Sequence, residues 1–161
     1  MDFSERLQKA VERGRQHGEV AVRQQRQSQL TEEESRALHA RARVELSDHI
    51  EACLQHVAHE FPGFDFQTVM TPEGFGAKIS RDNVRGRSGA LTRQYSHLEL
   101  IIRSYSTTRI LDVVCRGAIA NKEVLQRSQF QQLAELDLDT FRHLVDQWVL
   151  EYAEKYAASE R

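Results

Sequence analysis

The spacing of apolar residues changes abruptly at Pro62 and Gly63, and this change constrains the fold more than any other feature of the chain. Before Pro62, apolar residues recur every three or four positions, which is typical of amphipathic helices. After Gly63 they recur at every second position, which is typical of strands with one buried face. The sequence therefore predicts helices followed by a sheet.

Two helical stretches are expected before Pro62. Thr31 and Glu34 have the spacing of a capping box, and the charges of Glu32 and Glu33 suit the positive end of a helix dipole. We therefore expect a helix to begin at Thr31 and to lie in the core. Its apolar stripe consists of Leu38, Ala42, Leu46, Ile50, Cys53, Leu54, Val57 and Phe61.

Residues 1–30 have a thinner apolar stripe that fades into a polar run at 24–29. We expect a helical or partly disordered extension here, followed by a single α+β domain over 31–161. One rod through both helical stretches would extend about 85 Å at 1.5 Å per residue, which exceeds the width of such a domain. The first stretch is therefore expected either to fold back near 24–29 or to project and pair with a second copy as a short coiled coil.

Four strands are expected after Gly63, near 64–70, 75–79, 98–102 and 111–115. Pro72 and Gly74 occupy positions that a type I turn favours, so the first two strands should form a hairpin. A long loop, 81–94, then leads to the third strand. One face of the sheet is apolar and the other is mixed. The apolar face is expected to hold Phe64, Phe66, Thr68, Met70, Phe75, Ala77, Ile79, Leu98, Leu100, Ile102, Leu111, Val113 and Cys115.

The remaining chain predicts short helical turns over 121–136 and a clear C-terminal helix that Asp137 or Asp139 can cap. The apolar side of this helix carries Phe141, Leu144, Val145, Trp148, Val149, Tyr152 and Tyr156. Short connections between sequential strands favour a meander. The predicted fold is therefore α+β: a four-stranded antiparallel meander with a long N-terminal helical region and a C-terminal helix packed on one face.

Length indicates the number of domains, whereas the first residues, the apolar runs and the cysteines indicate the cellular setting. A length of 161 residues is typical of one domain that can form a sizeable core. Charged Asp2, Glu5 and Arg6 lie where the apolar part of an export signal would be, and no apolar run is long enough to cross a bilayer. Cys53 and Cys115 are far apart, which favours reduced thiols. We expect a cytoplasmic protein without membrane association.

The net charge of −2 conceals a basic region in the middle of the chain. Residues 76–127 hold ten basic and four acidic side chains, a local charge of +6. Within the loop 81–94, Arg85, Arg87 and Arg93 lie near Gly86 and Gly89, and guanidinium groups match phosphate or carboxylate. Alternatively, the loop is a solvated connection whose charges maintain solubility. The candidate anion-binding or partner-binding residues are Lys78, Arg81, Arg85, Arg87, Arg93, Arg103 and Arg116.

Catalytic and metal-binding patterns are weak. His49, Cys53, His56 and Glu60 share one stripe of the second helix, but a straight helix rarely supplies four ligands to one ion, so no metal site is predicted. No glycine pattern predicts a nucleotide cofactor. The exposed sheet face could place acid and base groups together if it bordered a pocket, although cross-strand charge pairs explain them equally. This set is His97, Glu99, Arg103, Tyr105 and Asp112.

Three functions are compatible with these patterns, and a non-catalytic function is favoured over an enzymatic one. The leading hypothesis is a non-catalytic interaction or adaptor module, forming a homodimer, that presents the basic loop and the open sheet face to an acidic protein. The second is sequence-tolerant nucleic-acid binding. The third is a small-molecule binding protein or an enzyme that uses the open sheet face. No cofactor and no catalytic residue are predicted.

Overall fold

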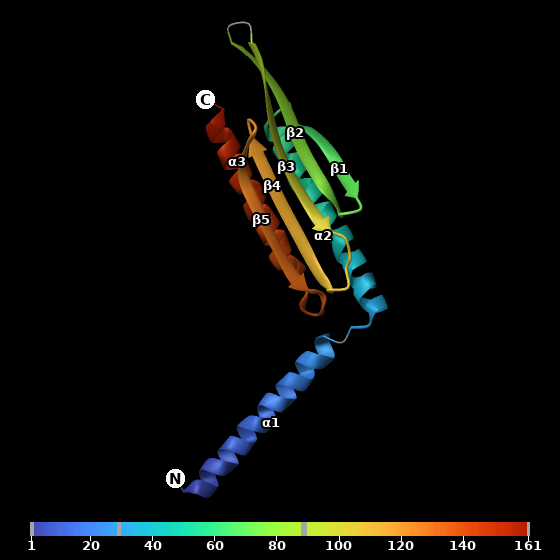
Figure 1. Ribbon diagram of the computed structural model, residues 1–161, viewed down its shortest axis with the longest axis vertical. Helices are drawn as coiled ribbons and strands as arrows, with labels where there is room; N and C mark the ends of the chain where they lie inside the picture. The colour runs from blue at the N-terminus through green and yellow to red at the C-terminus, as the bar shows by residue number, and fades with distance from the viewer. Residues whose placement is uncertain (1, 29, 88–89, 161) are drawn as a thin grey trace.

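The computed structural model describes residues 2–28, 30–87 and 90–160 and has the predicted α+β fold. Two helices, α1 (Phe3–Ser28) and α2 (Glu32–Glu60), precede one antiparallel sheet, and α3 (Leu138–Ser159) follows it. The strands lie in chain order, which makes the sheet a meander (Figure 1). They are β1 (Asp65–Thr71), β2 (Gly74–Arg87), β3 (Ala90–Arg103), β4 (Ile110–Ile119) and β5 (Lys122–Gln132).

The fifth strand replaces the short helical turns that the sequence predicted. β5 pairs with β4 along its length, and a single 3-10 turn, Leu133–Glu135, follows it. The hairpin turns through Ala120 and Asn121, which both have positive φ, 50° and 71°. Such turns are usually marked by glycine. Because β5 is an edge strand with only Leu125 fully inside the core, its sequence lacks the alternation of a central strand.

Both core helices begin where the sequence indicated. The Thr31 hydroxyl oxygen accepts a hydrogen bond from the Glu34 backbone N–H at 3.1 Å, which confirms the expected cap of α2. At α3, an Asp137 carboxylate oxygen accepts from the backbone N–H groups of Asp139 and Thr140. Each cap satisfies backbone donors that have no partner within the helix.

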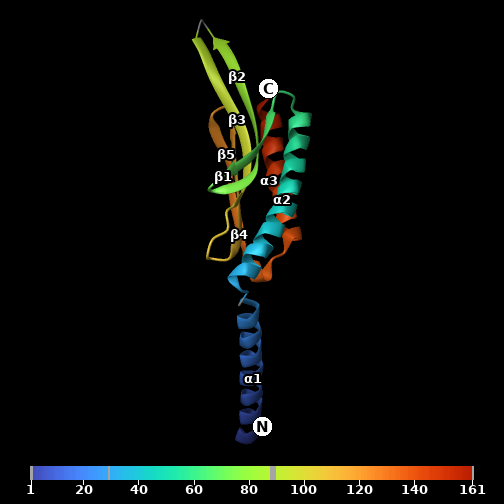
Figure 2. The same ribbon diagram turned by 90° about the vertical axis from the view of Figure 1, so that its right-hand side faces the viewer.

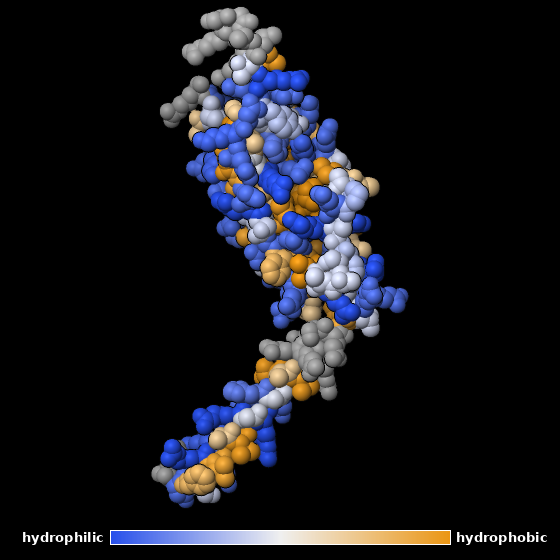
Figure 3. Space-filling view, viewed as in Figure 1, coloured by the Kyte–Doolittle hydropathy of each residue, from blue (hydrophilic) through white to orange (hydrophobic). Residues whose placement is uncertain are grey.

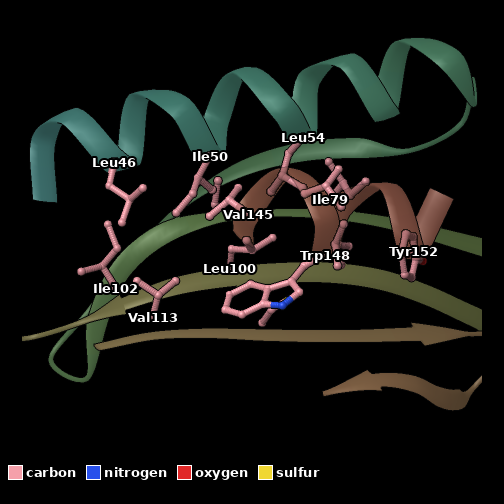
Figure 4. Packing of buried hydrophobic residues seen from close by; sticks show 14 of the residues in the cluster. Leu46, Ile50, Leu54, Ile79, Leu100, Ile102, Val113, Val145, Trp148 and Tyr152 are labelled. Carbon is pink, nitrogen blue, oxygen red and sulfur yellow. The ribbon is translucent and has the colours of Figure 1, made fainter. Parts of the chain in front are cut away.

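α2 and α3 cover the same face of the sheet and run in the same direction (Figure 2). Their contacts advance together along the chain, from Glu45 with Arg142 to Phe61 with Tyr156. The core lies between these helices and the strands (Figure 4). Its fully buried side chains include Leu46, Ile50, Leu54, Ile79, Leu98, Leu100, Ile102, Leu111, Leu125, Phe141 and Tyr152.

A close approach between α3 and the sheet depends on Gly117. A Cβ atom at this position would lie 2.8 Å from the Tyr152 ring. The ring therefore lies directly against the backbone of β4, and its hydroxyl donates to the Ala118 carbonyl at 2.9 Å. This bond satisfies a polar group in an otherwise apolar layer.

α1 projects away from the sheet and does not fold back (Figures 1 and 2). Its described side chains, over 3–22, are exposed, and Figure 3 shows a hydrophobic stripe along it. Near the junction with α2, the Arg109 guanidinium donates to the Leu30 carbonyl. Of the two arrangements expected for this stretch, the structure has the projecting one.

Candidate functional site

One face of the sheet is left open, because both core helices pack on the other (Figures 1 and 2). Strand alternation and the pairing register define what this open face presents. Residues of β3 with odd numbers lie on it, since their even-numbered neighbours Leu98, Leu100 and Ile102 are buried. In Figure 3 this face is mainly hydrophilic, with hydrophobic residues near its middle.

A hollow of about 660 Å³ lies on the open face. Its charged residues are arranged as pairs across the strands: Arg103 Nε lies 3.2 Å from Asp112 Oδ2, and Glu99 is opposite Arg116 in the register. Cross-strand pairs of this kind stabilise a solvated sheet face. The hollow therefore presents an apolar floor between largely balanced charges. Its lining includes Glu73, Glu99, Ile101, Arg103, Ile110, Asp112, Val114 and Arg116.

The hairpin β2–β3 extends far beyond the other strands and replaces the predicted loop over 81–94. β1 pairs with β2 only over 74–80, and β4 pairs with β3 only over 97–102. Residues 81–87 and 90–96 therefore pair only with each other, forming a two-stranded segment that we call the ribbon (Figure 2). Residues 88 and 89 of the expected loop lie outside the described residues.

The base of the ribbon is held by Asn121, in the turn between β4 and β5. Its side-chain amide donates to the Arg93 carbonyl at 2.8 Å, and its side-chain oxygen accepts from the Tyr95 backbone N–H at 2.9 Å. The Asn121 backbone N–H donates to the Tyr95 carbonyl. A two-stranded hairpin alone is marginally stable in water, so these bonds help to fix its direction.

The seven predicted binding residues do not form a single patch. Lys78 lies on the open face with its Nζ 5.4 Å from the centre of the Tyr95 ring, and Arg103 and Arg116 line the hollow. Arg93 is exposed on the ribbon. The backbones of Arg85 and Arg87 belong to the ribbon, where they pair with Thr92 and Ala90, but their side chains lie outside the described part.

Arg81 lies apart from the other six, on the side of the sheet that the helices cover. Its Nη1 donates to the Tyr156 hydroxyl at 2.9 Å and lies 3.9 Å from a Glu160 carboxylate oxygen. Its Nε donates to Asn83 Oδ1 at 3.0 Å. Arg81 therefore connects β2 to the end of α3. Alternation in β2 places its side chain opposite that of Lys78, which the sequence grouped with it.

The predicted acid-base set is not assembled either. Glu99, Arg103 and Asp112 line the hollow, whereas His97 stacks on Tyr95 with ring centres 5.3 Å apart. Burial lowers the pKa of His97, and the nearby Lys78 charge lowers it further. The prediction that Tyr105 lies on the open face is wrong, because β3 ends at Arg103 and the chain turns.

Tyr105 packs instead on the covered side of the sheet. Its ring meets His39 edge-on at 5.7 Å, and the Arg36 guanidinium carbon lies 4.8 Å from its ring centre. His39 is buried, and its Nε2–H donates to the Arg103 carbonyl at 3.1 Å. These contacts link the start of α2 to the end of β3.

A second group of reactive side chains lies between α2 and α3, on the side of the molecule opposite the open face. His49 Nε2 is 2.8 Å from Asp146 Oδ1, and Cys53 Sγ is 3.4 Å from the same oxygen. Burial, the hydrogen bond to Asp146 and the charge of that carboxylate raise the pKa of Cys53 to about 12. Without a bound cation, Cys53 is therefore a thiol, which is a poor nucleophile.

The sequence had grouped a different set. His56 and Glu60 share a stripe with His49 and Cys53, but both are exposed and lie outside the cluster. Asp146 takes their place from a helix almost one hundred positions along the chain. No local spacing indicates such a partner, so only the packing of α3 on α2 could reveal it.

Comparison with family models, with curated proteins and with solved structures found no match for this chain. Within the described residues, no helix combines the length and the apolar character needed to cross a membrane.

Proposed function

We propose that this protein is a non-catalytic interaction module that presents the ribbon and the adjoining open sheet face to an acidic protein partner. One observation supports this proposal above the others: the ribbon extends past the strands and helices that stabilise the rest of the sheet. Residues 83–94 contain three arginines and no acidic residue. A projecting basic segment suits contact with a partner better than it suits packing within the chain.

The charge distribution supports the ribbon over the rest of the basic region. Arg103, Arg127 and Arg81 each lie near a carboxylate of the same chain. Among described residues, Lys78 and Arg93 have no such ion pair, and they lie on the open face and the ribbon. Acidic groups of a partner would therefore meet guanidinium and ammonium groups that are not already paired.

The backbone of the ribbon adds a second means of binding. Its two strands pair with each other over 81–87 and 90–96, so each has an outer edge without a strand partner, although Asn121 already binds backbone groups of Arg93 and Tyr95 on the β3 edge. Outer edges of this kind can accept an extended segment of another protein by strand addition. Farther along the open face, at the end of β3 away from the ribbon, the apolar floor of the hollow can receive apolar side chains of the same partner.

Affinity capture tests the proposal. Purified protein is incubated with lysate at low and moderate salt, with and without nuclease, and retained proteins are identified by mass spectrometry. The expected result is that a discrete acidic protein is retained even after nuclease treatment. Its retention should be lost when Arg85, Arg87 and Arg93 are replaced by alanine. Retention of the same proteins by this triple variant would contradict the role of the ribbon.

Nucleic acid is the second candidate, favoured by the shape of the ribbon. The major groove of duplex DNA is wide enough to admit a two-stranded β-ribbon. Arginines on such a ribbon would contact phosphates without reading sequence, and the affinity would fall steeply with salt. A nucleic acid retained at low salt and removed by nuclease would support this function. Absence of a mobility shift at low salt would exclude it.

We further propose that α1 pairs with α1 of a second copy, giving a homodimer in the cytoplasm. Phe3, Leu7 and Val11 are 76%, 51% and 43% exposed and lie one helical turn apart. Gly14 and Gly18 continue this stripe, and a Cβ added at either meets no atom within 4 Å. Small residues in a stripe let two helices approach closely.

The free thiols of Cys53 and Cys115 are compatible with a reducing compartment.

A further inference from the structure

Three potential metal ligands from α2 and α3 converge on one point. His49 Nε2, Cys53 Sγ and Asp146 Oδ1 all lie within 4.8 Å of one another. The separations are 2.8 Å for nitrogen to oxygen, 3.4 Å for sulfur to oxygen and 3.6 Å for sulfur to nitrogen. The three side chains therefore surround a common position rather than forming a chain of contacts.

This convergence distinguishes the cluster from a catalytic relay. In a relay of cysteine, histidine and aspartate, one ring nitrogen faces the thiol and the other faces the carboxylate. Here both the thiol and the carboxylate lie near the same nitrogen, Nε2 of His49. A proton therefore cannot pass through the ring from Cys53 to Asp146. Three metal-ligand atoms around one position are the arrangement that a bound cation requires.

The separations also agree with tetrahedral zinc. Ligand atoms about 2.0–2.3 Å from a zinc ion, at tetrahedral angles, lie about 3.3–3.6 Å from one another. The two distances to sulfur, 3.4 and 3.6 Å, fall in this range. Only the 2.8 Å separation of His49 and Asp146 must widen, by about half an ångström on this geometry. The Asp146 side chain is 48% exposed, so a small rotation can provide it.

The donor atoms and their supports point to zinc rather than to magnesium or calcium. Thiolate and imidazole favour zinc, whereas magnesium and calcium prefer oxygen ligands. His49 and Cys53 are one turn apart on α2, whose neighbouring residues Ile50 and Leu54 are fully buried. Asp146 follows Val145, which is also fully buried. Packing in the core therefore holds in place both helices that carry the three ligand atoms.

We infer that His49, Cys53 and Asp146 bind one zinc ion, which links α2 to α3 and keeps a fourth position for water or an external ligand. The partial exposure of His49 and Asp146 gives solvent access to that fourth position. Three protein ligands with an open position distinguish such a site from a closed structural one. The site lies on the helix side of the molecule and does not depend on the proposed role of the ribbon.

Titration with Co²⁺, a spectroscopic substitute for zinc, tests this site in the full-length protein. The expected result is one equivalent of cobalt with a thiolate-to-metal charge-transfer band and intense visible bands of tetrahedral geometry. Added Zn²⁺ should abolish these bands and raise the melting temperature. No charge-transfer band with one equivalent of cobalt would overturn the inference.

Two variants and a matched control assign the ligands. Cys53→Ser should lose the charge-transfer band, and Asp146→Asn should weaken cobalt binding by more than about tenfold. His56→Gln removes an exposed histidine of the same helix and should leave the spectrum unchanged. Melting curves without metal show whether each variant is folded. A band that persists in Cys53→Ser, or that disappears in His56→Gln, would contradict the assignment.

Discussion

The two ends of the β2–β3 hairpin have the same strand geometry but opposite surroundings. At the base, β1 and β4 flank the hairpin and the helices cover it, so that Ile79, Leu98 and Leu100 are completely buried. In the ribbon, the two strands pair only with each other, and Arg93 is exposed. The comparison shows that burial, not strand pairing alone, stabilises this hairpin. The binding role that we propose for the ribbon would therefore involve few contacts of the core.

Core truncation at the base should have the largest effect. Replacing Leu100 with alanine removes a fully buried side chain between β3 and the helices. The expected loss is about 2–5 kcal/mol in the free energy of unfolding, from lost burial and the remaining cavity. Urea denaturation measures it. The matched change in the ribbon, Thr92→Ala, should cost less than about 0.5 kcal/mol, because Thr92 is exposed. Equal losses would remove the distinction between the two ends.

Loosening the ribbon at its base should have an intermediate effect. Asn121→Gly keeps a backbone that tolerates a φ of 71° but removes the side-chain bonds to Arg93 and Tyr95. We expect the free energy of local opening of the ribbon to fall by about 1–2 kcal/mol, because two hydrogen bonds are lost. Amide hydrogen exchange should accelerate over 90–96 and stay unchanged at Leu98 and Leu100. Uniform acceleration across the sheet would show that Asn121 does not act locally.

Lowering the pH should reduce the free energy of unfolding, because it protonates His39 at the covered end of the hairpin. Burial lowers the pKa of His39 and the charge of Arg43 lowers it further, although the hydrogen bond to the Arg103 carbonyl opposes this. The unfolded chain therefore binds a proton more readily than the folded one. The stabilising contribution of neutral His39 is complete above the unfolded pKa of about 6.5 and is lost as pH falls toward the folded pKa.

The substitution His39→Gln isolates this contribution, since glutamine keeps a donor but does not titrate. The free energy of unfolding is measured between about pH 7.5 and 4.5, a range that includes the unfolded pKa of histidine. As the pH is lowered, it should fall less steeply for the variant than for the unchanged protein. Identical slopes would mean that His39 is not responsible.

Removal of α1 should have the smallest effect on stability. Its described side chains are exposed, so deletion of residues 1–28 should change the unfolding free energy per chain by less than about 0.5 kcal/mol. Light scattering coupled to gel filtration should nevertheless show a dimer becoming a monomer. Leu7→Glu provides a point variant with the same expected change in mass. A truncated chain that remains dimeric would place the dimer contact elsewhere.

Local signals in the sequence were sufficient for the covered half of the molecule. The capping residue Thr31, the helical stripe through Leu46 and Ile50, and the alternation through Leu98 and Leu100 each predict their element from neighbouring residues. The α+β meander and the positions of α2 and α3 follow from these patterns. They succeed because burial imposes a regular period on the sequence.

The candidate sites were less predictable, because they lack that period or combine distant segments. Residues 81–96 contain two glycines and no regular apolar alternation, so they resemble a loop, although 81–87 pair with 90–96 as strands. Arg81 and Lys78 are close in sequence but point to opposite faces. Asp146 meets His49 only because α3 packs on α2. Distances of this kind arise from tertiary packing and have no counterpart in sequence spacing.

The most direct test of the account measures stability and partner binding in the same two variants. One replaces Arg85, Arg87 and Arg93 with alanine in the ribbon; the other replaces Arg6, Arg13 and Arg15 in α1, so both lower the net charge equally. We predict that both keep the original unfolding free energy within about 0.5 kcal/mol. Only the ribbon variant should lose the partner retained in the capture experiment. Equal binding by both variants, or unfolding of the ribbon variant, would contradict the separation of the stable core from the binding ribbon.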